Sequence, residues 1–104
     1  MELNDIVHGL VVFDWDEGNI DKNWEKHKVT ISECEDIFFN QPLIAIDYQH
    51  SQTEQRYFAY GITDKGKRLF ISFTVRQNKI RVISARNMNK KERRFYHEKI
   101  KDNT

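Results

Sequence analysis

Residues 79–96 read KIRVISARNMNKKERRFY, and this stretch decides the fold because it predicts a strand, a turn and a basic helix in succession. Its first part is rich in β-branched residues bounded by turn-forming residues, which favours a strand. These residues are Ile80, Val82 and Ile83. Asn89 followed three positions later by Glu92 is typical of a helix N-cap. The sequence therefore predicts a helix from Lys90 to about Ile100.

Arginines and lysines are concentrated on these two elements. Two arginines, Arg81 and Arg86, belong to the strand, and the helix begins with a basic cluster. The helix cations are Lys90, Lys91, Arg93 and Arg94. A guanidinium is always charged, and its planar fork matches the oxygens of a phosphate or a carboxylate. The stretch therefore indicates anion binding, and the anion is either an external phosphate or a carboxylate of this chain.

Three further strands are predicted upstream, at residues 43–48, 56–63 and 68–76. The last of these alternates, with Leu69, Ile71, Phe73 and Val75 facing one way and Arg68, Phe70, Ser72, Thr74 and Arg76 facing the other. Short turns at residues 64–67 and 77–78 predict an antiparallel arrangement, since Gly66 and Asn78 tolerate a positive φ.

The first 42 residues predict one strand and two helices. Residues 10–13 form a short apolar run, and residues 20–27 have helical spacing of apolar side chains. Thr30 and Glu33 form a capping box for a helix that ends before Pro42. The predicted order is β-α-α-β-β-β-β-α. This is an α+β fold in one domain, residues 1–104, with an antiparallel sheet of about four to five strands, two N-terminal helices and one C-terminal helix.

Composition excludes several classes of protein. The chain has no apolar run of membrane-spanning length, and its acidic N-terminus does not resemble a secretory signal. Cys34 is the only cysteine, so no internal disulfide forms, which fits a cytoplasmic location. The four histidines are scattered and no CxxC or HxxxH spacing occurs, so we expect no metal site and no cofactor.

Charge is distributed unevenly along the chain. Residues 1–55 contain 3 Lys and Arg against 12 Asp and Glu, whereas residues 56–104 contain 14 against 4. The two halves therefore carry 3 − 12 = −9 and 14 − 4 = +10. Such an imbalance indicates either ion pairing between the halves or a surface that binds nucleic acid.

Four segments together resemble the BrnT family of type II toxins. They are FDWDEGNIDKNWEKHKV (13–29), ISECEDIFFNQP (31–42), EQRYFAYG (54–61) and IRVISARNMNKKERRFY (80–96), and the resemblance covers roughly residues 10–97. It implies a compact, RelE/barnase-like endoribonuclease that is inhibited by a BrnA-like antitoxin with its own DNA-binding motif. It also implies a heterotetramer of two toxins joined through an antitoxin dimer. Lys28 departs from the family, which typically has glycine at this helix C-cap position.

RNA cleavage without a metal needs a base for the ribose 2′-OH, an acid for the leaving oxygen and cations for the developing charge. We expect Arg56, Arg81 and Arg86 to stabilise that charge. Arg81 and Arg86 are five residues apart, so a regular strand would place them on opposite faces unless a bulge or the strand end redirects one. The alternative for Arg81 is an ion pair with an N-terminal acidic residue, and for Arg56 an ordinary charge at a strand edge.

Candidates for proton transfer are His27, Lys22, Glu54, Tyr60 and Tyr96. We predict catalytic roles for His27 and Tyr60, because a histidine titrates near neutral pH and a tyrosine can donate a hydroxyl proton. Lys22 and Tyr96 are predicted to bind RNA, together with the helix cations Lys90, Lys91, Arg93 and Arg94. The alternatives are a helix-terminal role for His27 and core packing for the tyrosines.

The sequence thus predicts a metal-independent endoribonuclease toxin that cuts RNA and inhibits translation and growth. The alternative is a non-catalytic module that binds RNA or the antitoxin on the same fold. A purely structural partner whose basic face docks an acidic antitoxin is a third possibility.

Overall fold

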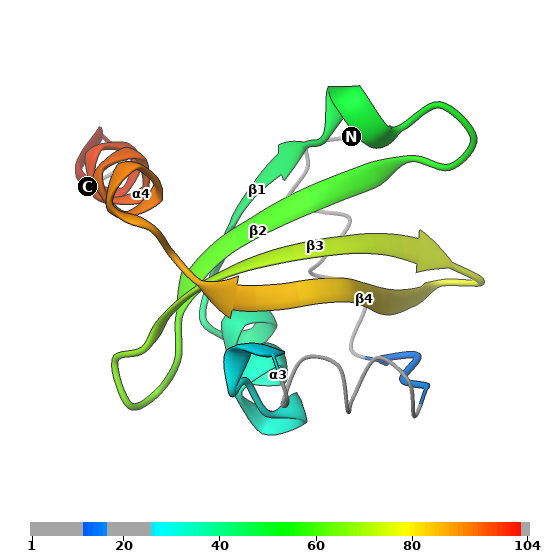
Figure 1. The fold of residues 1–104 in the computed structure, drawn as a ribbon, viewed down its shortest axis with the longest axis horizontal. Helices are drawn as coiled ribbons and strands as arrows, with labels where there is room; N and C mark the ends of the chain where they lie inside the picture. The colour runs from blue at the N-terminus through cyan, green and yellow to red at the C-terminus, as the bar shows by residue number, and fades with distance from the viewer. Residues whose placement is uncertain (1–11, 17–25, 103–104) are drawn as a thin grey trace.

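The computed structural model describes residues 12–16 and 26–102, and these form an α+β fold. Its elements are α3 (Ile31–Phe39), β1 (Leu43–Ile46), a short 3-10 helix (Tyr48–His50), β2 (Arg56–Ile62), β3 (Arg68–Arg76), β4 (Lys79–Asn87) and α4 (Lys90–Asp102). The four strands form one antiparallel sheet in the order β1-β2-β3-β4. Helix α3 lies against one face, and α4 lies at one end of the sheet (Figure 1).

The three later strands follow the predicted meander closely. Strand β3 has the predicted bounds, and its alternation is confirmed as far as Phe73, because Leu69, Ile71 and Phe73 are fully buried. Beyond Phe73, Thr74 on the other face is also buried and Val75 is only partly buried. The β3–β4 turn places Gln77 at φ 52° and Asn78 at φ 63°, as expected of a two-residue hairpin turn. Strand β1 ends at Ile46, two residues earlier than predicted, because the Asp47 carboxylate accepts the His50 N–H and turns the chain.

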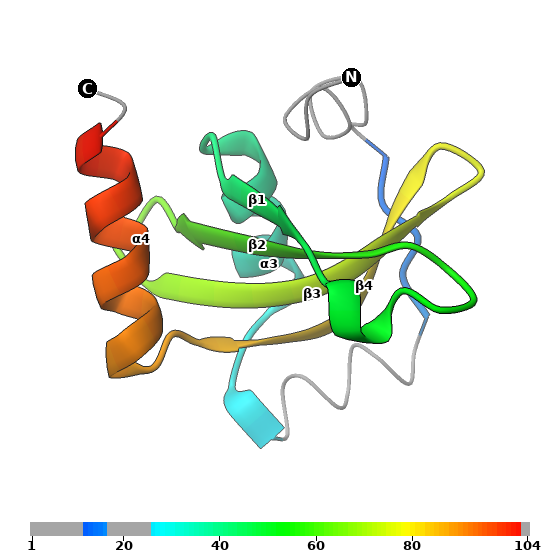
Figure 2. The same cartoon turned by 90° about the horizontal axis from the view of Figure 1, so that it is seen from above.

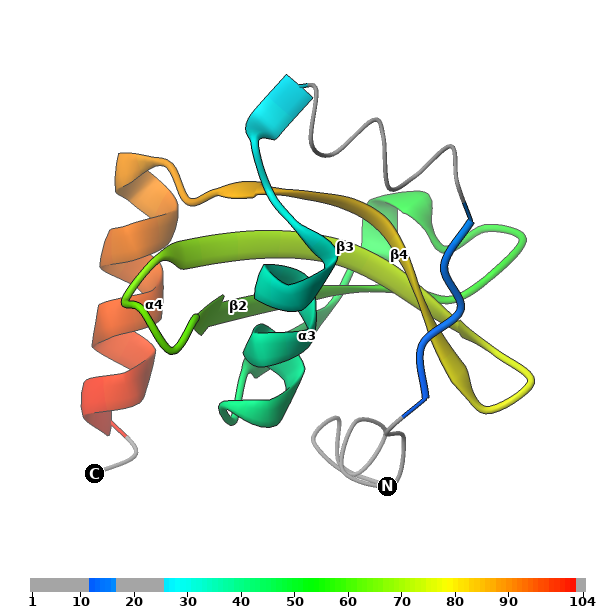
Figure 3. The same cartoon turned by 90° about the horizontal axis from the view of Figure 1, so that it is seen from below.

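Helix α3 begins with the predicted capping box. The Thr30 hydroxyl accepts the Glu33 N–H, and the Glu33 carboxylate accepts the Thr30 N–H. The helix lies across one face of the sheet (Figure 3). Its buried side chains, Cys34, Ile37 and Phe38, belong to the hydrophobic core that it forms with that face. The helix approaches β2 so closely that a Cβ on Gly61 would lie 2.8 Å from the Ile37 Cγ2 atom.

Helix α4 also begins with the predicted cap. The Glu92 N–H donates to the Asn89 side chain at 2.8 Å, and the Glu92 carboxylate accepts the Asn89 N–H at 2.9 Å. Met88 and Tyr96 are buried where the helix meets the sheet. A hydrogen bond also joins α4 to β3: the Nε–H of Arg68 donates to the His97 ring nitrogen at 3.0 Å.

The described part of the N-terminal segment runs beside β4. Phe13 forms a parallel bridge with Ile80, and its ring packs edge-on against Phe38 at 5.6 Å. The predicted strand at residues 10–13 is described only from Val12, and most of the predicted helix at residues 20–27 lies outside the described residues. Of that helix, Lys26 and His27 are helical and Lys28 follows at φ 57°. The left-handed conformation explains why glycine suits this C-cap position.

Candidate functional site

The face of the sheet opposite α3 carries most of the predicted site residues. Cross-strand register places on this face Arg56, Phe58 and Tyr60 from β2, Phe70, Ser72 and Thr74 from β3, and Arg81, Ser84 and Arg86 from β4. We call this set the open face, because no helix of the described residues crosses its middle (Figure 2). Helix α4 borders one end of it, where the Tyr60 and Phe95 rings meet at 5.2 Å.

A β-bulge at Ile83 determines which arginines share this face. Ser72 pairs with Ser84, but the next residue, Phe73, pairs with Val82, so Ile83 is an extra residue in β4. Because side chains alternate along a strand, this extra residue brings Arg81 and Arg86 to the same face. Both arginines can therefore contribute to one site, which a regular strand would not allow.

Arg81 is nevertheless neutralised by carboxylates from the N-terminal segment. Its Nη1 lies 3.4 Å from the Asp14 carboxylate, and its Nη2 lies 2.7 Å from that of Asp16. This is the ion pairing that stood as the alternative for Arg81. These contacts tie the segment before the first predicted helix to the outer edge of the sheet.

Arg86 differs from Arg81 in its charge balance, because it pairs with a single carboxylate, and one edge of its guanidinium makes no hydrogen bond to a described residue. Nη1 and Nη2 donate to the two Glu92 carboxylate oxygens at 2.7 and 2.8 Å, and Nη1 also donates to the Asn87 carbonyl at 3.2 Å. A guanidinium has five N–H donors, and these contacts use three. The two others, on Nε and Nη2, lie side by side. Arg86 is therefore held in place while keeping a fork for a second anion.

Two aromatic rings complete the surroundings of Arg86. Its Cζ atom lies 4.6 Å from the centroid of the Phe70 ring, and the rings of Phe70 and Tyr60 meet edge-on at 5.1 Å. Burial raises the pKa of the Tyr60 hydroxyl, and the Glu92 charge raises it further against the opposing effect of Arg86. Tyr60 is therefore protonated near neutral pH, and its hydroxyl is close enough to Glu92 and Arg86 for their charges to act on it.

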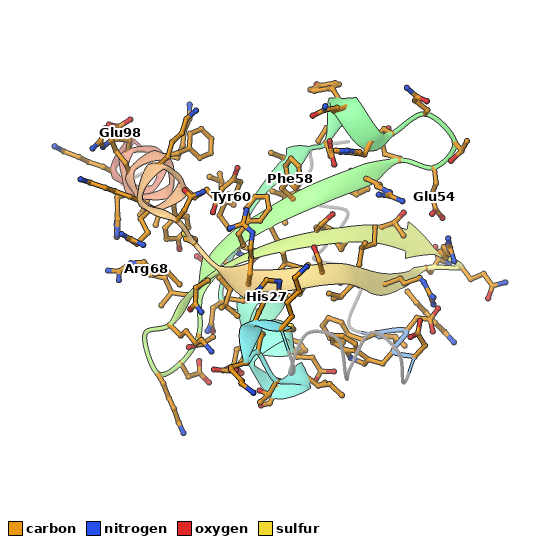
Figure 4. The ribbon with its side chains drawn as sticks, in the orientation of Figure 1. His27, Glu54, Phe58, Tyr60, Arg68 and Glu98 are labelled. Atoms are coloured by element: carbon orange, nitrogen blue, oxygen red, sulfur yellow. The ribbon has the colours of Figure 1, made fainter. Side chains whose placement is uncertain are left out.

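The opposite end of the open face contains Arg56 and a second arginine–glutamate pair. Arg76 donates to both Glu54 oxygens, at 2.6 and 2.9 Å. These hydrogen bonds and the Arg76 charge lower the pKa of Glu54, which makes it a weak base. Glu54 lies at the end of the sheet far from Tyr60 (Figure 4). Arg56 makes no ion pair with any described residue and interacts with Glu54 only at longer range. Its charge is therefore available to a ligand.

The predicted RNA contacts on α4 divide into exposed and buried residues. Lys90, Lys91, Arg93 and Arg94 are all exposed. Arg93 donates to the Met88 carbonyl, whereas the other three have no ion pair within the described residues. Tyr96 is only 5% exposed, and burial raises the pKa of its hydroxyl. Its ring packs between helix and sheet, so it cannot stack on a base while α4 stays in place.

His27 and Lys22 belong to the segment before α3. Lys22 lies outside the described residues. His27 is partly buried at the end of its helical turn, on the β4 side of the sheet (Figure 4). The structure thus places Arg56, Tyr60 and Arg86 on one face with His27 beside its outer strand.

Sequence reasoning missed the contacts that Glu92 and Phe70 make with Arg86. The signal for Phe70 was its position among the polar residues of the alternating β3 strand, where an aromatic ring cannot be part of the main core. Glu92 was assigned only to the helix cap, and its contact with Arg86 depends on how α4 leaves the sheet.

Within residues 12–16 and 26–102, no cluster of three or more His, Cys, Asp or Glu side chains has a geometry that could hold a metal ion. None of the described helices is long and apolar enough to span a membrane.

Comparison with known families assigns the chain. Residues 15–92 match the family described as the ribonuclease toxin, BrnT, of type II toxin-antitoxin systems. This chain belongs to the BrnT family. The match includes every described member of the open face, from Arg56 to Arg86, and extends into the first turn of α4. Membership in a type II toxin–antitoxin family implies an RNA substrate and an antitoxin partner. No individual curated protein matches the chain.

Proposed function

We propose that this BrnT protein is a metal-independent endoribonuclease whose active site is the open face around Arg86. The observation that carries the proposal is the half-used guanidinium of Arg86, which Glu92 holds in place and which keeps two adjacent N–H donors. Such a fork fits two non-bridging oxygens of a phosphodiester. The developing negative charge of the phosphorane would meet a fixed cation there, which is the largest contribution in many enzymes.

Tyr60 and His27 are the proposed proton-transfer groups. Cleavage begins when the ribose 2′-OH loses its proton and its oxygen attacks the phosphorus, and it ends when the 5′-oxygen leaves with a proton. The products are a 2′,3′-cyclic phosphate and a 5′-hydroxyl. Tyr60 keeps its proton and lies beside Arg86, which suits donation to the leaving oxygen. His27 is proposed as the base.

Arg56 and the α4 cations are proposed to hold the RNA on either side of the scissile phosphate. Arg56 lies four residues before Tyr60 on β2, a separation of roughly 13 Å along the strand. Lys90, Lys91 and Arg94 border the other side of the face. We assign Arg81 to the docking of the N-terminal segment rather than to the phosphate, because two carboxylates offset its charge.

The test is cleavage of RNA by the purified protein in the presence of EDTA. Arg86→Ala is expected to lower the cleavage rate by at least about a hundredfold, the usual effect of removing one donor to a developing oxyanion. Arg86→Lys keeps the charge but loses the fork, so it is expected to remain strongly impaired. Arg76→Ala is the control, because Arg76 also makes two hydrogen bonds to one glutamate, through Nε and Nη2, at the far end of the sheet.

The proposal fails if EDTA abolishes cleavage, if the products lack a 2′,3′-cyclic phosphate, or if Arg86→Ala cleaves as fast as Arg76→Ala. Intact RNA with every variant, combined with salt-sensitive RNA binding, would support the alternative of a non-catalytic RNA-binding module. Tyr60→Phe and His27→Ala, measured across pH, would separate the acid from the base.

The antitoxin is proposed to act by covering this face. A BrnA-like partner would place a segment over Arg86 and the α4 cations, in a heterotetramer of two toxins and an antitoxin dimer that contacts DNA through the antitoxin alone. We also propose that the fold is RelE-like. A complex that binds RNA as tightly as the free toxin would refute the blocking mechanism, and its mass in solution would test the stoichiometry.

A further inference from the structure

The middle of the open face contains a partly exposed phenylalanine beside small side chains. Phe58 on β2 pairs with Ser72 on β3, and Ser72 pairs in turn with Ser84 on β4. On its other side Phe58 pairs with Ala45 of β1. All four side chains are partly accessible to solvent. The cross-strand neighbours of Phe58 are therefore small, and the Phe58 residue itself is partly exposed among them.

Phe58 does not belong to the main core. That core lies on the other face of the sheet, where Ala59, Phe73 and Val82 are buried under α3. The Phe58 ring instead joins an aromatic row on the open face. It lies 4.8 Å from Phe70, which adjoins Tyr60, and Tyr60 adjoins Phe95 at the base of α4. Core packing therefore does not account for this row.

The two serines offer polar atoms beside the ring. Each hydroxyl is both a donor and an acceptor, and neither makes a side-chain hydrogen bond to any described residue. Arginines flank these side chains: Arg56 is two residues before Phe58 on β2, and Arg86 is two residues after Ser84 on β4. An aromatic ring, free hydroxyls and flanking guanidiniums are the parts that recognise an unpaired base with its phosphates.

We propose that Phe58, Ser72 and Ser84 form a nucleobase subsite, in which one unpaired base of the RNA stacks on the Phe58 ring. Its polar edge meets the two serine hydroxyls, and its phosphates extend toward Arg56 and Arg86. This inference rests on the proposed function, since it names where the RNA next to the scissile phosphate is held. The surrounding charge favours RNA over a peptide, because a peptide would have to be acidic to offset the arginines.

The test is binding of a single-stranded 2′-fluoro RNA oligonucleotide that carries one 2-aminopurine. This RNA has no 2′-OH nucleophile, so binding is measured without cleavage, and 2-aminopurine fluorescence falls when the base stacks. The full-length protein is expected to quench the probe. Phe58→Leu is expected to weaken binding by at least about fivefold and to reduce the quenching at saturation, the usual scale for one stacked base. Phe58→Tyr keeps a ring and is expected to retain both.

Phe39→Leu is the matched control. Phe39 is 62% exposed at the end of α3, on the opposite side of the sheet, so its substitution should leave RNA binding unchanged. Thermal unfolding of each variant identifies any loss of binding that comes from misfolding. The wild-type quenching is a second readout that needs no variant: binding of the probe at saturation without quenching overturns the proposal.

Unchanged RNA affinity in a folded Phe58→Leu protein also overturns it, including the case in which that variant loses only antitoxin binding. The two proposals fail separately. Protein that quenches the probe but leaves ordinary RNA intact refutes the ribonuclease and retains the subsite. Protein that cleaves RNA at the same rate and affinity without the Phe58 ring refutes the subsite and retains the ribonuclease.

Discussion

Replacing Glu92 by glutamine tests whether the Arg86 contact stabilises the fold as well as the site. Glutamine keeps the length of the side chain and a carbonyl oxygen that can still accept the Asn89 N–H, so the helix cap survives. What is lost is the negative charge opposite Arg86 and one of the two hydrogen bonds to it. We expect the variant to remain folded and to be less stable.

The magnitude follows from the partial burial of the pair. The Arg86 side chain is 36% exposed and that of Glu92 is 16% exposed. Fully exposed ion pairs contribute about 0.2–1 kcal/mol, whereas hydrogen bonds to charged groups contribute about 1.5–3 kcal/mol. Because glutamine retains one hydrogen bond, we expect a loss of about 1 kcal/mol at pH 7, which lowers the midpoint of thermal unfolding by about 5 °C in a domain of this size.

The pH dependence gives the sharper test. Burial raises the pKa of Glu92, but the Arg86 hydrogen bond, the Asn89 N–H and the Arg86 charge together lower it more, so the net shift is downward. A carboxyl with a lower pKa in the folded state stabilises the fold above its unfolded pKa of about 4.3, and that contribution is lost as the pH falls through the folded value. The difference between wild type and Glu92→Gln should therefore be constant from pH 7 to about pH 5 and then shrink.

The assay is urea denaturation of wild type, Glu92→Gln, Arg86→Gln and the double variant at each pH. The coupling energy between the two positions should be about 1 kcal/mol at pH 7 and should approach zero in acid. Glu98→Gln, on the exposed surface of the same helix, is the control and should stay within about 0.5 kcal/mol of wild type. Coupling below about 0.3 kcal/mol at pH 7, or coupling that persists in acid, would refute the reasoning.

Three further predictions concern the scaffold. Lys28→Gly should raise the free energy of unfolding by about 1 kcal/mol in urea denaturation, because Lys28 adopts φ 57°, and an unchanged value would contradict this. Gly61→Ala should lower it by about 1–3 kcal/mol, because the new Cβ lies 2.8 Å from the Ile37 Cγ2 atom. Adding Ile37→Leu removes that methyl group and should recover part of the loss. The Cys34 thiol should resist alkylation at pH 8 until the protein unfolds, since burial raises its pKa to about 12; rapid labelling of native protein would oppose this.

The features that sequence predicted well are local ones. Both capping boxes depend on residues three apart, Thr30 with Glu33 and Asn89 with Glu92, and both form as expected. The alternation of β3 fixes its inner and outer faces without reference to any other strand. The β3–β4 turn is likewise decided by the residues that it contains.

The features that sequence could not predict arise from contacts between distant segments. The bulge at Ile83 depends on how β4 pairs with β3, and without it the parity of Arg81 and Arg86 is wrong for a shared face. The partners of Arg81 lie more than 60 residues away, at Asp14 and Asp16. No local pattern could show that Arg81 pairs with two carboxylates of a distant segment, whereas Arg86 pairs with one carboxylate six residues along the chain.

The uneven charge of the chain has two explanations: ion pairing between its halves and a surface that binds nucleic acid. Both find support in the structure. Acidic residues of the first half pair with basic residues of the second at three described places: Asp14 and Asp16 with Arg81, Glu33 with Lys67, and Glu54 with Arg76. These pairs lie at the edges and loops of the sheet, where they hold segments together. The cations that remain without an ion pair in the described chain include Arg56 on the open face and Lys90, Lys91 and Arg94 beside it. Internal pairing therefore occupies Arg76 and Arg81 on the open face itself, and it leaves Arg56 on that face and three cations of α4 beside it without a carboxylate among the described residues. Under the proposed function, these four cations are the part of the excess charge that binds RNA rather than holding the fold together.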